Sequence, residues 1–127
     1  MDAIEIELPL PPRVLSKNAR VHWRTRAAAF REHRTWGMYK LREACGTAVP
    51  LWDGAVMDIT WYQVKSGGGT DDDNVIARCA AFRDGFAAAG LVSDDKYITV
   101  GDVSVVRVAT KAAHRVLIRL ERRYAGD

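Results

Sequence analysis

Residues 74–90 have the sequence NVIARCAAFRDGFAAAG, in which apolar side chains recur in steps of four, three, four and three residues. These side chains are Val75, Cys79, Phe82, Phe86 and Ala89. Such steps bring side chains to one side of an α-helix, so the pattern predicts a helix over about 74–89 with one buried stripe. Gly90 stands where a left-handed closing residue is expected, and Asp72 or Asp73 is a suitable N-cap.

The segments before this helix predict two strands and another helix. Residues 3–8 alternate apolar and charged side chains before a run of prolines, which is typical of a half-buried strand. Residues 55–64 combine β-branched, aromatic and apolar side chains, as a central strand does. Residues 27–45 are rich in Ala, Arg, Glu and Leu and predict a helix that ends near Gly46.

Three short β-like runs follow the 74–89 helix, at residues 97–100, 103–109 and 116–120. The last two are separated by a short loop around residues 111–114, so we expect them to be antiparallel neighbours. This order of elements predicts an α+β fold with a mixed sheet and two helices packed on one face. A chain of 127 residues has the usual size of one domain, so residues 1–127 are expected to form a single one.

Basic residues are unevenly distributed, although the formal net charge is only +3. Residues 13–42 contain nine Lys or Arg against one acid, and residues 107–123 contain six against one. Two basic segments around an acidic centre are typical of a protein that binds a polyanion around a metal, although solvated surface charge gives the same pattern. Residues 12–26 read as a long polar loop. Within it Trp23 either stacks on an exposed base or, as its setting favours, anchors the loop in a partly buried position.

The remaining composition indicates a reduced, cytoplasmic setting. The two cysteines form no CxxC motif, and no leading apolar segment resembles a signal peptide or a membrane span. The three histidines are scattered among basic residues, so a Ser/His or Cys/His catalytic arrangement has no support, and each is expected to be a surface or phosphate-contacting side chain. These histidines are His22, His33 and His114.

Five aspartates form two tight groups, one on each side of the predicted 74–89 helix. They are Asp71, Asp72 and Asp73, which follow a glycine-rich gap, and the pair Asp94 and Asp95. Negative charge concentrated in this way favours a bound cation, and hard oxygen ligands prefer Mg²⁺ or Mn²⁺ to zinc. If residues 70–73 are extended, Asp71 and Asp73 point to the same side and can share one ion.

A purely structural interpretation of the aspartates stays open at this point. The first group is also what a helix N-terminus attracts, and the second is an ordinary Asp-rich turn. A helix of sixteen residues spans roughly 24 Å, so a site that uses both groups requires the chain to fold back. An EF-hand is excluded, because the sixth position counted from Asp71 is Ile76 and the twelfth is Phe82.

Several segments in a fixed order resemble the RusA family of Holliday junction resolvases, over nearly the whole chain. They are the opening strand with its prolines at residues 4–12, the run Asp71–Asn74, the helix segment Phe82–Phe86, the segment Ala89–Val92 and the pair Asp94–Asp95. The resemblance implies a homodimeric, Mg²⁺-dependent endonuclease that nicks four-way DNA junctions symmetrically in recombination and repair. Mn²⁺ is expected to substitute for Mg²⁺.

The resemblance also implies roles for individual residues. The metal ligands would be Asp71, Asp73 and Asp95, with Asp94 as the competitor for the third place. The residues expected to contact DNA phosphates are Arg13, Lys17, Arg20, Arg24, Arg26 and Lys65, together with basic residues of the 107–123 segment.

The chain departs from the family pattern at one catalytic position. The family places a lysine early on the helix after the second aspartate, whereas this chain has Ala77, Ala80 and Ala81. Arg78 is the one cation in the first two turns and is the candidate to replace the lysine electrostatically, although arginine is a poor proton donor. Two alternatives follow: a DNA-junction-binding protein that has lost nuclease activity, and a nuclease acting on other branched or single-stranded DNA.

Overall fold

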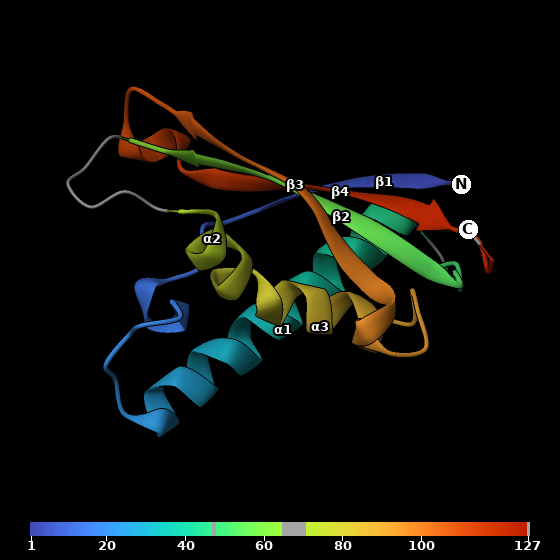
Figure 1. Cartoon of the computed structure of the whole chain (residues 1–127), viewed down its shortest axis with the longest axis horizontal. Helices are drawn as coiled ribbons and strands as arrows, with labels where there is room; N and C mark the ends of the chain where they lie inside the picture. The colour runs from blue at the N-terminus through green and yellow to red at the C-terminus, as the bar shows by residue number, and fades with distance from the viewer. Residues whose placement is uncertain (47, 65–70, 127) are drawn as a thin grey trace.

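A four-stranded mixed sheet forms one layer, and the helices cover one of its faces (Figure 1). The computed structural model describes residues 1–46, 48–64 and 71–126. In chain order the elements are β1 (Ala3–Leu8), η1 (Arg13–Leu15), α1 (Trp23–Cys45), β2 (Gly54–Gln63), α2 (Asp72–Arg78), α3 (Ala80–Ala88), η2 (Asp95–Tyr97), β3 (Ile98–Arg107), η3 (Lys111–Ala113) and β4 (Arg115–Arg123). The predicted α+β class is therefore confirmed. None of the described helices is long and apolar enough to cross a membrane.

The strand order is β1-β4-β2-β3, with β2 parallel to β3 and the other two pairs antiparallel. The expectation that the last two strands are neighbours was wrong, because β2 lies between them. The α2–α3 segment connects β2 to β3 by crossing one face of the sheet, so β3 lies beside β2 and runs parallel to it. The other side of β2 takes β4, whose Val116, Ile118 and Leu120 are buried, as expected for an interior strand.

The runs at 97–100 and 103–109, predicted as separate strands, belong to the single strand β3. Gly101 and Asp102, which separate the two runs, lie at an irregularity where the register with β2 shifts between Met57 and Ile59. The Asp102 N–H donates to Asp58 Oδ1 at 2.8 Å. A Cβ at position 101 would overlap the side chains of Asp58 and Val56, so any residue larger than glycine would displace them. Gly101 and Asp102, which the sequence pattern indicated as a gap between two strands, thus form a β-bulge within one continuous strand.

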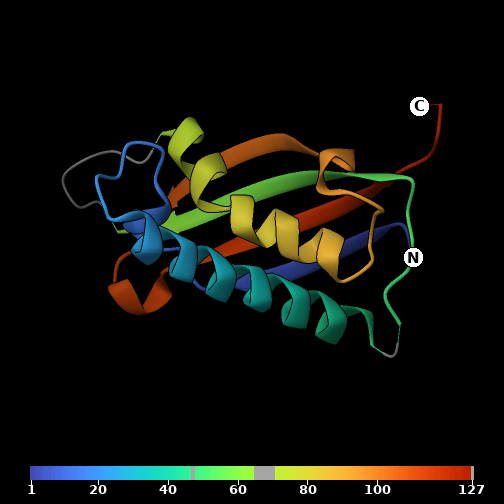
Figure 2. The same ribbon diagram turned by 90° about the horizontal axis from the view of Figure 1, so that it is seen from below.

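Helix α1 begins at Trp23, four residues before the predicted start, so the polar loop is shorter than expected. His22 is its N-cap, and the His22 ring Nδ1 accepts the Arg24 N–H at 3.1 Å. His33 is buried rather than exposed as predicted, with its Nδ1 2.8 Å from the Ala29 carbonyl oxygen. Figure 2 shows α1 lying beside α3 across the sheet.

The predicted helix over 74–89 is present as α2 and α3, which meet at Cys79. Its stripe is confirmed for Val75, Cys79, Phe82 and Phe86, which are all fully buried, whereas Ala89 is half-buried and is the C-cap of α3. The Cys79 N–H still donates to the Val75 carbonyl oxygen at 3.0 Å and the Arg83 N–H to the Cys79 carbonyl oxygen at 3.2 Å, so hydrogen bonding continues through the bend between the two helices. Gly90 has a φ of +102° and closes α3 as predicted.

Candidate metal and nucleic-acid site

The first acidic group forms the N-terminus of α2. Asp71 has extended backbone and is the N-cap, with its Oδ1 accepting the Asn74 N–H at 2.8 Å. Asp72 and Asp73 lie in the first helical turn, and all three carboxylates are exposed. Asp72 and Asp73 are helical, so the condition of an extended chain, under which Asp71 and Asp73 would point to the same side, is not met. The cap is Asp71 rather than the predicted Asp72 or Asp73. Free N–H groups and the helix dipole stabilise negative charge here, which favours an early helix start.

The second acidic group lies at the far end of the α2–α3 segment. Asp94 caps η2, and its Oδ1 accepts the Lys96 N–H at 3.0 Å. This bond, followed by a hydrogen bond with the Asp95 side chain, lowers the pKa of Asp94. Figure 1 shows α2 and the orange η2 turn at opposite ends of the helical segment.

Within the described part of the protomer the two acidic groups do not meet. No group of three or more His, Cys, Asp or Glu side chains among residues 1–46, 48–64 and 71–126 is placed to hold a metal ion. The direction of the crossover explains the separation: α2–α3 runs from the last residues of β2 back to the first residues of the parallel strand β3, so its two ends lie at opposite ends of these strands. The expected fold-back is therefore not found there, and the roles of Asp94 and Asp95 as metal ligands stay predictions.

Arg78 is buried and holds the proline-rich segment against α2. Its Nε and Nη2 both donate to the Pro11 carbonyl oxygen, at 3.1 and 2.5 Å, and its guanidinium lies 4.6 Å from the centre of the Trp61 ring. Burial lowers the pKa of Arg78. The catalytic role expected for Arg78 stays a prediction, and these contacts favour a positioning role for the side chain.

The basic residues before and at the start of α1 lie at the same end of the molecule as the first acidic group (Figure 2). Their loop is fixed by Arg26, whose Nη1 donates to the carbonyl oxygens of Val14 at 3.4 Å and Ser16 at 3.0 Å. The other expected DNA-contacting residues of this segment are exposed; they are Arg13, Lys17, Arg20 and Arg24. Lys65 lies outside the described residues.

Trp23 is exposed over 67% of its surface, so the prediction of a partly buried loop anchor was wrong. The His22 ring stacks beside the Trp23 ring, with centroids 5.7 Å apart, and the Arg24 guanidinium lies 5.2 Å from its centre. The earlier helix start explains the exposure, because it places Trp23 in a first turn that extends beyond the sheet. An exposed aromatic ring among cations suits contact with a nucleobase.

The second basic segment is less available for phosphates than expected. Three of its arginines lie in β4 and pair with acids: Arg115 with Glu7 at 2.9 Å, Arg119 with Glu121 at 3.7 Å and Arg122 with Asp2 at 3.8 Å. Arg115 pairs with an acid of the neighbouring antiparallel strand β1 and Arg122 with Asp2 just before that strand, whereas the Arg119–Glu121 pair lies within β4. These three arginines are therefore less available to phosphates than the exposed Arg13, Lys17, Arg20 and Arg24 at the α2 end of the molecule.

Comparison with known proteins gives no function. No protein-family profile matches the chain. An uncharacterized protein of Xylella fastidiosa (strain Temecula1 / ATCC 700964) is 33% identical to it over 96 residues, which are 74% of this chain and 62% of that protein. The chain thus spans less than two thirds of the length of this relative. The resemblance to the RusA family rests on the residues quoted above.

Proposed function

We propose that this chain is a Mg²⁺-dependent, structure-selective DNA endonuclease similar to the RusA family, which resolves Holliday junctions by paired symmetric nicks in DNA recombination and repair. One observation carries the proposal: the acidic start of α2 and the exposed cations around η1 and the start of α1 share one end of the molecule. The hydrogen bond from Arg78 to the Pro11 carbonyl oxygen holds α2 against the segment that leads into η1. The protein acts in the cytoplasm, and Mn²⁺ substitutes for Mg²⁺.

The donor set fits the metal. Mg²⁺ in proteins is commonly held by one or two carboxylates together with water and substrate phosphates, so the exposed Asp71 and Asp73 suffice as protein ligands. When bound, Mg²⁺ supplies an acidified water and charge neutralisation at the phosphate. Arg13, Arg20 and Arg24 hold the DNA backbone beside the aspartates by neutralising neighbouring phosphates.

Substitutions at the start of α2 test the metal-binding role of each aspartate. Asp73→Asn should abolish Mg²⁺-dependent cleavage of a synthetic four-way junction and leave junction binding intact or stronger. Asp71→Ser keeps an effective N-cap and removes the carboxylate, so cleavage should fall without loss of helix stability. Asp72→Asn is the matched control and should retain cleavage. Unchanged cleavage by Asp73→Asn would refute the ligand assignment.

The contribution of the second acidic group is tested separately. Asp95→Asn and Asp94→Asn change a region at the other end of the helical segment from Asp73. Loss of cleavage with the first and retention with the second would assign Asp95 to the active metal site. Retention with both would leave Asp71 and Asp73 as the protein ligands.

A homodimer is part of the proposal, because two symmetric nicks in a two-fold junction call for two active sites related by the same symmetry. The number of nicks made per binding event measures this directly. A cruciform plasmid cut in both strands before the protein dissociates would be linearised, whereas independent nicking would first produce the open circle.

A junction-binding protein without nuclease activity is the second candidate. Two observations favour it: the chain has Ala77, Ala80 and Ala81 early on the helix where the family has a lysine, and the guanidinium of Arg78 is engaged by the Pro11 carbonyl oxygen. A gel shift on four-way, forked and flap DNA, paired with cleavage assays in Mg²⁺ and Mn²⁺, separates the candidates. Binding without cleavage selects this one, and preferred cleavage of forks or flaps selects a nuclease for other branched DNA.

A further inference from the structure

A pocket of about 290 Å³ lies where β2 begins and β4 ends, at the end of these strands away from the start of α2. We call it the strand-end pocket. Four parts of the chain line it: the start of β2, the η2 turn, the start of β3 and the residues that follow β4 (Figure 1). The side chains that decide its chemistry are Asp53, Lys96, Tyr97, Thr99, Arg123 and Tyr124.

Backbone contacts hold the walls of the strand-end pocket in place. Gly54 and Arg123 are paired neighbours in the antiparallel β2–β4 ladder. A Cβ at Gly54 would lie 3.1 Å from the Tyr97 carbonyl oxygen, so a side chain there would crowd the backbone of η2, and its absence leaves room in the pocket. The Ala125 N–H donates to Asp53 Oδ2 at 3.0 Å and ties the segment after β4 to the start of β2. Strand pairing and this hydrogen bond together fix the positions of the lining residues.

Two cations, Lys96 and Arg123, line the strand-end pocket. Within the part of the chain that the structure describes, neither of them takes part in an ion pair. Arg123 Nη1 donates to Thr99 Oγ1 at 3.3 Å, so this hydroxyl positions the guanidinium. Asp94 and Asp95 precede Lys96 in the chain but are not among the residues that line the pocket. Two cations at one concave site favour an anion with several oxygens, and a phosphate group accepts hydrogen bonds from arginine and lysine together.

Two tyrosine rings add a flat apolar surface to the same pocket. Tyr97 is 44% exposed and Tyr124 is 48% exposed. A cation lies near each ring: Lys96 Nζ is 5.2 Å from the centre of the Tyr97 ring, and the Arg122 guanidinium is 4.4 Å from the centre of the Tyr124 ring. The Tyr124 hydroxyl donates to Asp2 Oδ1 at 2.9 Å, so its polar end is engaged and its ring remains as a contact surface. Half-exposed aromatic rings of this kind stack on flat conjugated ligands such as nucleobases.

Asp53 supplies a third kind of group to the strand-end pocket. One of its carboxylate oxygens accepts the Ala125 N–H, and a carboxylate has further lone-pair positions that a ribose hydroxyl can use. Cations for a phosphate, an acceptor for a sugar and rings for a base thus line one pocket. A volume of about 290 Å³ is close to the lower end of the range for small-molecule sites, about 300–1,000 Å³, which favours a single nucleotide over a longer strand.

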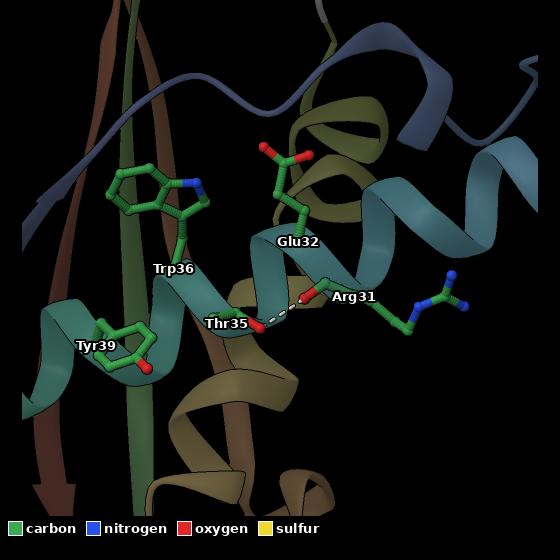
Figure 3. A pocket seen from close by; sticks show the side chains of 5 residues that line it. All are labelled: Arg31, Glu32, Thr35, Trp36 and Tyr39. Atoms are coloured by element: carbon green, nitrogen blue, oxygen red, sulfur yellow. Dashed lines mark hydrogen bonds between the residues drawn. The ribbon is translucent and has the colours of Figure 1, made fainter.

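A second pocket, on the exposed side of α1, does not offer this combination (Figure 3). It has a volume of about 500 Å³ and is lined by Arg31, Glu32, Thr35, Trp36 and Tyr39. All five side chains come from one helix, and Figure 3 shows Arg31 pointing away from Trp36 and Tyr39. The cation and the rings of this pocket therefore do not converge on one ligand, whereas the strand-end pocket has walls from several elements.

We propose that the strand-end pocket binds a nucleoside monophosphate. Lys96 and Arg123 hold the phosphate. The rings of Tyr97 and Tyr124 contact the base, and Asp53 accepts a hydrogen bond from the sugar. This inference is independent of the proposed function, because the pocket lies at the other end of the strands from the start of α2 and needs neither DNA nor a metal ion.

Titration calorimetry of the full chain in EDTA, with no junction DNA present, tests the class of ligand. The probes are AMP, adenosine, inorganic phosphate and a 5′-phosphorylated DNA tetranucleotide. AMP should bind at least about tenfold more tightly than adenosine or phosphate, because only AMP meets the cations and the rings together. Binding of AMP that is no tighter than binding of phosphate would overturn the proposal.

Two variants test the residues of the pocket. Arg123→Gln removes the guanidinium charge and should weaken AMP binding at least about tenfold. Tyr97→Leu removes one ring and should weaken AMP binding while the affinity for inorganic phosphate stays the same. Arg119→Gln is the matched control, because it removes the same charge from β4 at a position outside the pocket and should leave AMP binding unchanged. Circular dichroism verifies that each variant keeps its fold.

The remaining outcomes also decide the proposal. Equal loss of AMP affinity in Arg119→Gln and Arg123→Gln would indicate a general effect of charge and would overturn it. A tetranucleotide that binds more tightly than AMP, and that loses this affinity in Arg123→Gln, would identify the end of a DNA strand as the ligand and would overturn it as well. Because AMP binding is measured without junction DNA or Mg²⁺, its absence would leave the proposed nuclease intact, and absence of junction cleavage would leave the nucleotide site intact.

Discussion

Replacing Arg78 tests whether this cation positions the proline-rich segment or takes part in catalysis. Lysine keeps the charge but cannot present two nitrogens to the Pro11 carbonyl oxygen while covering the Trp61 ring. Arg78→Lys should therefore lower the free energy of unfolding by about 2 kcal/mol. Denaturation in urea measures the change, and Arg83→Lys is the control, because Arg83 is half-buried and its bond to the Ile98 carbonyl oxygen is long, at 3.5 Å.

A catalytic role would give the opposite combination of results. Lost junction cleavage with unchanged stability in Arg78→Lys would make this side chain part of the chemistry. Cleavage that falls only as the protein unfolds, and that returns at a lower temperature, would agree with the positioning role.

Cys79 makes stability depend on pH in a defined direction. Burial raises the pKa of its thiol from 9.0 to about 12. Above pH 9 the unfolded chain loses this proton while the folded chain keeps it, so the free energy of unfolding falls as pH rises toward about 12, by up to about 1.4 kcal/mol per pH unit. Urea denaturation at several pH values should show a steeper fall for the unmodified protein than for Cys79→Ala. Parallel curves would contradict the assignment.

At the scale of elements, the contact between α1 and α3 depends on two glycines. A Cβ at Gly85 would overlap the Arg34 carbonyl oxygen, whereas a Cβ at Gly37 would lie 2.9 Å from the Phe82 carbonyl oxygen. Alanine normally stabilises a helix by about 1 kcal/mol relative to glycine. Here Gly85→Ala should destabilise the protein by about 2 kcal/mol, because two backbones must separate, and Gly37→Ala should cost less. Thermal and urea denaturation measure both, and a stabilised Gly85→Ala would disprove the close approach.

Elements with strong periodicity were predictable from the sequence, but which strands pair with one another in the sheet was not. The stripe from Val75 to Phe86 indicated its helix because burial imposes that spacing directly. The start of α1 was missed because a histidine, His22, serves as its N-cap in place of the usual Ser, Thr, Asp or Asn. The pairing of β4 with β2 rather than β3 depends on which edge of β2 the crossover leaves open, and no local pattern encodes it.

The candidate site was predictable only in part for the same reason. The residue types at Asp71 and Asp73 indicated metal chemistry, and their place at a helix start followed from capping. The distance between this group and Asp95 is set by the direction of the α2–α3 crossover, which is a property of the sheet.

At the scale of the whole molecule, positive charge is divided into a free part and a paired part. The segment that carries the exposed Arg20 and Arg24 lies at the same end of the molecule as the acidic start of α2, while Arg119 lies in β4 and pairs with Glu121. Although the net charge is small, the α2 end of the molecule carries exposed cations that can attract DNA, whereas the arginines of β4 are largely neutralised by acids. DNA should therefore approach the α2 end, and the open face of the sheet should contribute little.

Salt dependence measures this asymmetry. Each phosphate contact contributes about 0.9 to the slope of log K against log salt, because a counterion is released with it. Arg20→Gln and Arg24→Gln should each weaken binding of a fluorescent four-way junction and reduce the slope by about that amount. Arg119→Gln removes the same charge from β4 and should leave the slope unchanged. Equal effects of all three in an anisotropy titration over a series of salt concentrations would place DNA across the sheet as well, and the α2 end would lose its special role in binding.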